Sequence, residues 1–201
     1  HDFVAQAGGH GAAAVMIERP VAGLRIPTLR VPDTRRALGE LARGWRRRFD
    51  PLLIAVTGSN GKTTVKEMLA AILAQAVGSA HRLATSGNLN NEVGVPLTIF
   101  GLRQAHRAAV VELGMNRPGE IAWLAEIAQP QVVLVNNAQR EHQEFMGSVE
   151  ATARENGSAF AVLPATGVAV FPVDDPHAPI WRSLAEGRRV VGFGYSGTGD
   201  P

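Results

Sequence analysis

A glycine-rich loop set between an apolar strand and a helix is the feature that most constrains this chain. Residues 52–57 predict a buried strand and residues 63–76 predict a helix, and between them lies Gly58-Ser59-Asn60-Gly61-Lys62-Thr63-Thr64. Glycines let successive backbone N–H groups turn towards phosphate oxygens, and the helix N-terminus adds partial positive charge. Only two residues separate the glycines, against four in the common phosphate-binding loop, but the strand–loop–helix context predicts phosphate binding.

Lys62 and Thr63 give this loop its expected chemistry. Lys62 can neutralise the β and γ phosphates of a nucleotide, and the Thr63 hydroxyl can ligate Mg²⁺. The chain has only one other lysine, Lys66, because its remaining cationic residues are all arginine. A lysine at this place in an arginine-rich sequence therefore favours a binding loop over a chance turn.

Three further segments are candidates for the same site. Glu112 lies in the apolar strand predicted over 108–113, at the sheet edge where ligands of α/β proteins gather, so it can hold Mg²⁺ opposite the loop. His142 follows the strand predicted over 131–136, but position alone favours an ordinary surface histidine. Residues 85–92 are rich in amides and hydroxyls, which fits a substrate loop and a capped surface loop equally well.

Strands and helices alternate after Asp50-Pro51, where we place a domain boundary between residues 1–49 and 50–201. The expected strands are continuous apolar runs, as a sheet covered on both faces requires. The sequence therefore predicts an α/β fold with a doubly wound, mostly parallel sheet, preceded by the tail of a smaller α/β domain. Other expected elements are strands over 12–17, 29–31, 167–171 and 189–193 and helices over 34–48, 93–100, 119–128, 149–161 and 178–185.

Composition excludes several classes of protein. The chain has 201 residues and no cysteine, which rules out a disulfide scaffold and a cysteine nucleophile. Its formal net charge is only +2, so nucleic acid is not an expected partner. No apolar run approaches the roughly 20 residues of a membrane-spanning helix, so we expect no membrane insertion.

Longer motifs resemble the Mur ligases of bacterial cell-wall synthesis. The glycine loop resembles the family's ATP loop, residues 88–96 its substrate loop, and Asn136-Asn137 with His142 its asparagine-and-histidine segment. Residues 112–121 resemble the branch that joins D-alanyl-D-alanine to a UDP-linked muramoyl tripeptide, UDP-MurNAc-tripeptide. Residues 1–4 and 31–34 resemble the end of the domain that holds the uridine nucleotide.

The resemblance implies an ATP-dependent ligase, a cytoplasmic monomer, in which the amine of D-Ala-D-Ala attacks an acyl phosphate of the tripeptide. It implies catalytic roles for Lys62, Glu112 and His142, and ligation of Mg²⁺ by Thr63, Glu112 and His142. The residues that it assigns to ATP are Gly58, Ser59, Asn60, Gly61, Lys62, Thr63, Thr64 and Asn137. Those that it assigns to the nucleotide-sugar substrate are Asn88, Asn90 and Asn91.

Two departures from the family pattern affect the expected site. The family's carbamoylated lysine, a metal ligand, is replaced by Asn156, and a neutral amide cannot be carbamoylated. The usual asparagine before a paired acid is also missing, since residues 171–175 read Phe-Pro-Val-Asp-Asp. We expect this branch to position its second metal and the adenine differently, with Glu155 as a substitute ligand.

The resemblance also implies a three-domain protein of which this chain holds a part. Residues 1–49 resemble the tail of the UDP-substrate domain and residues 50–201 a truncated ATP-binding domain, with the C-terminal ligase domain absent. We therefore expect the chain alone to bind nucleotide weakly and to catalyse little. Two alternatives stay open: another Mur or folylpolyglutamate-type ligase, against which residues 116–121 argue, and a nucleotide-binding module that makes no bond.

Overall fold

The computed structural model describes residues 1–139 and 147–194, and its main feature is a six-stranded sheet with the order β4-β5-β3-β6-β7-β8. Every strand pairing in this sheet is parallel. The strands are β3 (Leu52–Thr57), β4 (Arg82–Ala84), β5 (Ala108–Glu112), β6 (Val132–Val135), β7 (Val168–Pro172) and β8 (Arg189–Phe193). The predicted α/β class with a doubly wound parallel sheet is confirmed.

Helices cover both faces of this sheet. They are α3 (Lys62–Val77), α4 (Gly94–Phe100), α5 (Glu120–Ala128), α7 (Val149–Gly157) and α8 (Ala178–Leu184), with the 3-10 helices η1 (Ser79–His81) and η2 (Ser158–Val162). Successive residues of β3 point to opposite faces: Leu53 and Ala55 pack with α4, α5, α7 and α8, whereas Val56 packs with α3. Burial on both faces explains why the strands are continuous apolar runs.

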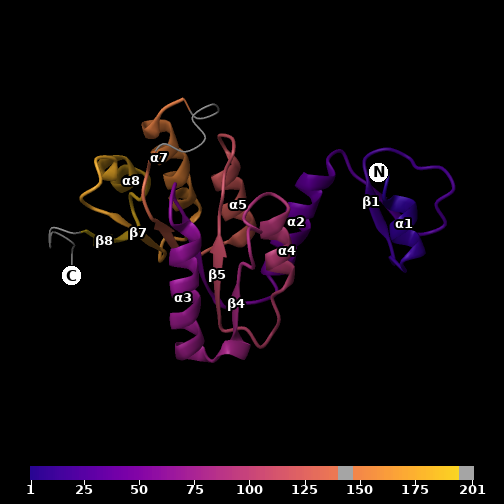
Figure 1. The fold of residues 1–201 in the computed structure, drawn as a ribbon, viewed down its shortest axis with the longest axis horizontal. Coiled ribbons are helices and arrows are strands. Elements are labelled where there is room, and N and C mark those ends of the chain that lie inside the picture. The colour runs from indigo at the N-terminus through magenta and orange to yellow at the C-terminus, as the bar shows by residue number, and fades with distance from the viewer. Residues whose placement is uncertain (140–146, 195–201) are drawn as a thin grey trace.

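Residues 4–30 form a small unit that lies to one side of the large sheet (Figure 1). It contains α1 (Val4–Gly9) and the parallel pair β1 (Val15–Ile17) and β2 (Thr28–Arg30). Helix α2 (Thr34–Arg46) follows, capped by the Asp33 carboxylate, and packs against α4 and α5. The Arg36 guanidinium lies 3.4 Å from the centre of the Trp123 ring of α5, so α2 joins the small unit to the large sheet.

Most expected elements agree with the structure to within a few residues, and the strand over 52–57 agrees at both ends. The helix expected over 149–161 instead ends at Gly157 and continues as η2. The sequence interpretation missed α1 and the edge strand β4, which has only three residues. Within the described ranges, no helix combines the length and the apolar character needed to cross a membrane.

Candidate functional site

The glycine loop leaves β3 at the centre of the sheet, where the strands β5 and β6 lie on either side. Gly58 and Gly61 have φ values of 130° and 76°, which L side chains rarely adopt. A Cβ on Gly58 would also lie 3.0 Å from the backbone nitrogens of Asn136 and Asn137, after β6. The backbone therefore requires both glycines, and α3 begins directly behind them at Lys62.

Two asparagines after β6 hold the middle of the loop. The Asn137 side chain accepts the Asn60 N–H at 3.0 Å and donates to the Asn60 carbonyl at 3.0 Å. Asn136 donates to the same carbonyl at 2.5 Å. The structure therefore places Asn137 against the glycine loop, the neighbourhood expected for an ATP-binding residue.

Lys62, Thr63 and Glu112 come together at the carboxyl edge of the sheet. Lys62 Nζ donates to the carbonyl oxygens of Gly58 at 2.6 Å and Ser59 at 2.9 Å, so the ammonium lies over the loop. The Thr63 hydroxyl donates to Glu112 Oε2 at 3.0 Å, which links the start of α3 to the end of β5. The loop hydroxyl and the carboxylate expected to serve one Mg²⁺ are thus in direct contact.

The three asparagines assigned to the substrate have different surroundings. Asn90 Nδ2 donates to Glu112 Oε1 at 2.8 Å. Asn91 Oδ1 accepts the N–H groups of residues 93 and 94 at 3.1 and 2.9 Å, so it caps α4. Asn88 is exposed and faces a cavity of about 160 Å³. This cavity is lined by Lys62, Asn88, Asn90, Asn91, Gly114, Met115 and Asn116.

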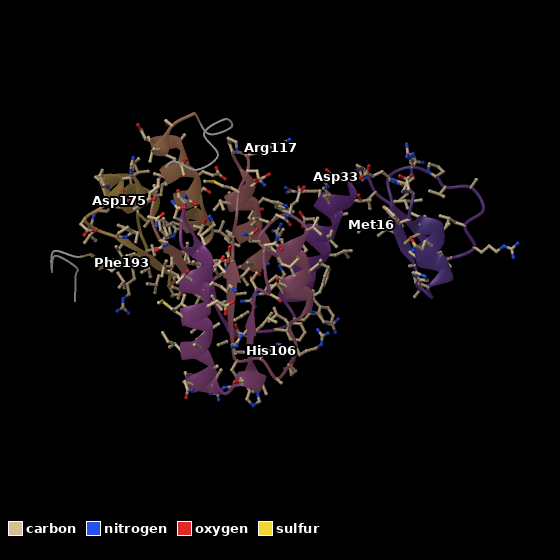
Figure 2. The ribbon with its side chains drawn as sticks, viewed as in Figure 1. Met16, Asp33, His106, Arg117, Asp175 and Phe193 are labelled. Carbon is tan, nitrogen blue, oxygen red and sulfur yellow. The ribbon has the colours of Figure 1, made fainter. Side chains whose placement is uncertain are left out.

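A larger cavity, of about 560 Å³, borders the loop on the side of β7 and β8. Its lining residues are Asn136, Asn137, Gln139, Pro172, Asp174, Asp175, Phe193 and Gly194. Figure 2 shows Asp175 and Phe193 near one another at this end of the molecule. The volume is in the range of small-molecule sites. The sequence interpretation missed Phe193, which could have been found from its place at the carboxyl end of β8.

Glu155, expected as a substitute metal ligand, contacts the backbone at the start of α5. Its Oε2 accepts the Gly119 N–H and its Oε1 accepts the Ile121 N–H, both at 2.9 Å, and the residue is buried. This carboxylate therefore caps the start of α5, and its expected role as a substitute metal ligand stays a prediction. Across residues 1–139 and 147–194, no three His, Cys, Asp or Glu side chains gather into a metal cluster. His142 lies outside the described residues.

Asn156, where the resemblance leads us to expect the family's lysine, contacts the start of the glycine loop. Its Oδ1 accepts the Thr57 hydroxyl at 2.7 Å and the Gly58 N–H at 3.1 Å. The side chain is 1% exposed. The amide thus supports the backbone from which the loop departs.

Comparison with known proteins identifies relatives along nearly the whole chain. The ligase of Escherichia coli named UDP-N-acetylmuramoyl-tripeptide–D-alanyl-D-alanine ligase is 43% identical, over 96% of this chain and 42% of its own length. A crystal structure of MurF from Acinetobacter baumannii matches all of this chain and 43% of its own, with 37% identity and a TM-score of 0.90. MurF from Thermotoga maritima in complex with ADP matches with 32% identity and a TM-score of 0.88, over 100% of this chain and 45% of its own.

The chain therefore spans about two fifths of the length of the curated relative. The family model described as Mur ligase middle domain matches residues 56–200, which include the loop, Glu112 and both cavities. Because this match covers more than half of the chain, the chain belongs to the Mur ligase family.

Proposed function

We propose that this chain forms the ATP-binding part of a ligase that joins D-alanyl-D-alanine to UDP-MurNAc-tripeptide. The observation that carries the proposal is the contact of Thr63 with Glu112 beside Lys62, next to a cavity lined by amides. Residues 1–49 would then complete a domain for the UDP substrate, and residues 50–201 would belong to the ATP-binding domain. We expect the complete protein to be a cytoplasmic monomer.

ATP fits the loop and the larger cavity together. The loop N–H groups and Lys62 suit the β and γ phosphates, because the α3 N-terminus and the ammonium favour negative charge there. The adenosine would extend into the 560 Å³ cavity past Asn137. Carboxylates such as Asp175 can accept hydrogen bonds from ribose hydroxyls, and Asp175 is itself held by the His177 N–H at 2.8 Å.

The residues present also fit Mg²⁺. Thr63 and Glu112 offer a hydroxyl and a carboxylate in contact with each other, and Mg²⁺ in nucleotide sites commonly uses one or two carboxylates with phosphate oxygens and water. These two residues would hold the ion, which when bound neutralises charge on the transferring phosphate. His142 remains a predicted ligand.

The proposed reaction has two steps. A carboxylate oxygen of the tripeptide forms a bond to the γ-phosphorus while the bond to the leaving ADP oxygen breaks. The amine of D-Ala-D-Ala then attacks the acyl carbon, loses a proton, and phosphate leaves. In this scheme Lys62 holds the charge of the phosphoryl group, and the cavity between Lys62 and Asn88 is where the substrate carboxylate meets it.

Mg²⁺-dependent phosphate release by the complete protein tests the proposal. We expect release to require ATP, UDP-MurNAc-tripeptide and D-Ala-D-Ala together, and to fall about 100-fold or more in Lys62→Ala. Arg154→Ala is a matched control, because in the described part of the chain this exposed cation on α7 pairs only with Glu150, and its loss should leave the rate unchanged. ATP binding without substrate-dependent release would favour a binding module, and release with a different amino compound would favour another ligase of the family.

A further inference from the structure

The carboxylate of Glu112 is held from two sides by two different segments. Thr63 donates to Oε2 from the start of α3, and Asn90 donates to Oε1 at 2.8 Å from the loop after β4. The Glu112 N–H is fixed as well, because it donates to the Thr85 hydroxyl at 3.0 Å. With Glu112 only 2% exposed, these contacts set the plane of the carboxylate.

Asn90 is itself held against the chain that follows β5. The Gly114 N–H donates to the Asn90 carbonyl at 2.8 Å. A Cβ on Gly114 would lie 2.8 Å from Asn90 Cγ and 2.9 Å from Nδ2, so the Asn90 amide lies where any side chain at 114 would be. The absence of a side chain at Gly114 therefore leaves the space in which the Asn90 amide lies and from which it reaches Glu112.

The other two asparagines of this segment do not share this contact. Asn91 caps α4, and Asn88 is exposed at the 160 Å³ cavity. Asn90 alone of the three donates to Glu112 among the hydrogen bonds of the described residues. Its side chain is thus committed to the carboxylate, while Asn88 is available to a ligand in the cavity.

We propose that Asn90 is a positioning residue that holds the Glu112 carboxylate in place for Mg²⁺, rather than a contact to the nucleotide-sugar substrate. The inference rests on the proposed function, because it needs Glu112 to serve the metal. It also implies that the position of the Glu112 carboxylate depends on the loop that carries Asn88 and Asn90. A shift of this loop would then move the carboxylate as well.

The test measures the affinity of the complete protein for a non-hydrolysable ATP analogue, once with Mg²⁺ and once with EDTA. We expect Asn90→Ala to weaken binding with Mg²⁺ by at least about tenfold, the lower end for a hydrogen bond to a charged group, and to leave binding in EDTA unchanged. In a Glu112→Gln background the same change should add less than about twofold, because coupled residues are not additive. Gln75→Ala, which removes an exposed amide on α3, should have no effect.

A second variant separates positioning from loss of folding. Gly114→Ala keeps the Asn90 amide but displaces it, so it should reproduce the Mg²⁺-specific loss while the melting temperature shows that the protein is folded. The proposal is overturned if Asn90→Ala leaves the Mg²⁺-dependent affinity unchanged and raises the KM for the tripeptide, or if its effect persists in full beside Glu112→Gln. If Glu112→Gln itself leaves the Mg²⁺ dependence unchanged, the metal role of Glu112 in the proposed function fails as well.

Discussion

Replacing Asn156 with alanine should destabilise the fold at the point where the glycine loop begins. Asn156 Oδ1 accepts both the Thr57 hydroxyl and the Gly58 N–H, and all three residues are buried. In the variant the Gly58 N–H would stay buried without that acceptor.

The expected cost follows from these two hydrogen bonds. A buried donor left without an acceptor costs about 1–3 kcal/mol, and the neutral bond to the Thr57 hydroxyl contributes about 1 kcal/mol. The Asn156 Nδ2 is one of two buried polar side-chain atoms without a hydrogen bond in the described part of the chain, so its removal costs nothing. The free energy of unfolding should therefore fall by about 2–4 kcal/mol. With a slope of about 2 kcal/mol per molar urea, the midpoint falls by about 1–2 M.

Urea unfolding followed by circular dichroism measures this change, and two further variants serve for comparison. Thr57→Val removes only the hydroxyl bond and should cost about 1 kcal/mol. Arg154→Ala removes an exposed ion pair to Glu150 on the same helix and should change stability by less than about 0.5 kcal/mol. The reasoning is refuted if Asn156→Ala costs no more than Thr57→Val, because Oδ1 would then contribute nothing through the Gly58 N–H.

Two further predictions concern the N-terminal part of the chain. Gly39→Ala would place a Cβ 2.5 Å from the Trp123 ring and should lower the free energy of unfolding by about 1–3 kcal/mol. A Cβ on Gly44 of the same helix meets nothing within 4 Å, so Gly44→Ala should raise the free energy of unfolding by up to about 1 kcal/mol. Equal melting temperatures of the two variants would contradict this packing. Hydrogen bonds from the Thr34 N–H and hydroxyl lower the pKa of Glu18, so the stabilisation is present above the usual carboxyl pKa and is lost as pH falls through the lowered folded value. Thr34→Val should raise the pKa of Glu18 in a carboxyl NMR titration, and an unchanged midpoint would rule out a contribution from the hydroxyl.

The parts of the fold that sequence could predict are those set by local pattern. Continuous apolar runs predicted the central strands, because burial on both faces confines polar residues such as Thr57 and Glu112 to their carboxyl ends. The edge strand β4 was missed because Arg-Leu-Ala is too short to show a pattern. Its pairing with β5 depends on the tertiary fold.

In the candidate site, too, sequence predicts what local pattern sets and misses what tertiary contacts decide. The glycine loop could be predicted because its chemistry lies in consecutive residues. The separate surroundings of Asn88, Asn90 and Asn91 could not, because three residues of one type in one loop offer no local signal that distinguishes them. Asn90 meets Glu112 across 22 residues of sequence, and only the packing of the loop against β5 decides that contact.

At position 156, where the resemblance leads us to expect a lysine, the asparagine makes a contact that a lysine could not make. A lysine has three donors and no acceptor, so its ammonium could not accept the Gly58 N–H as Asn156 Oδ1 does. The amide therefore stabilises the loop through a bond that an unmodified lysine could not make. Glu155 beside it caps α5, and under the proposed function Thr63 and Glu112 are the pair in the described part of the chain that would hold Mg²⁺. Under that proposal the placement of the Glu112 carboxylate matters more, and Asn90 is the residue of its loop that sets it.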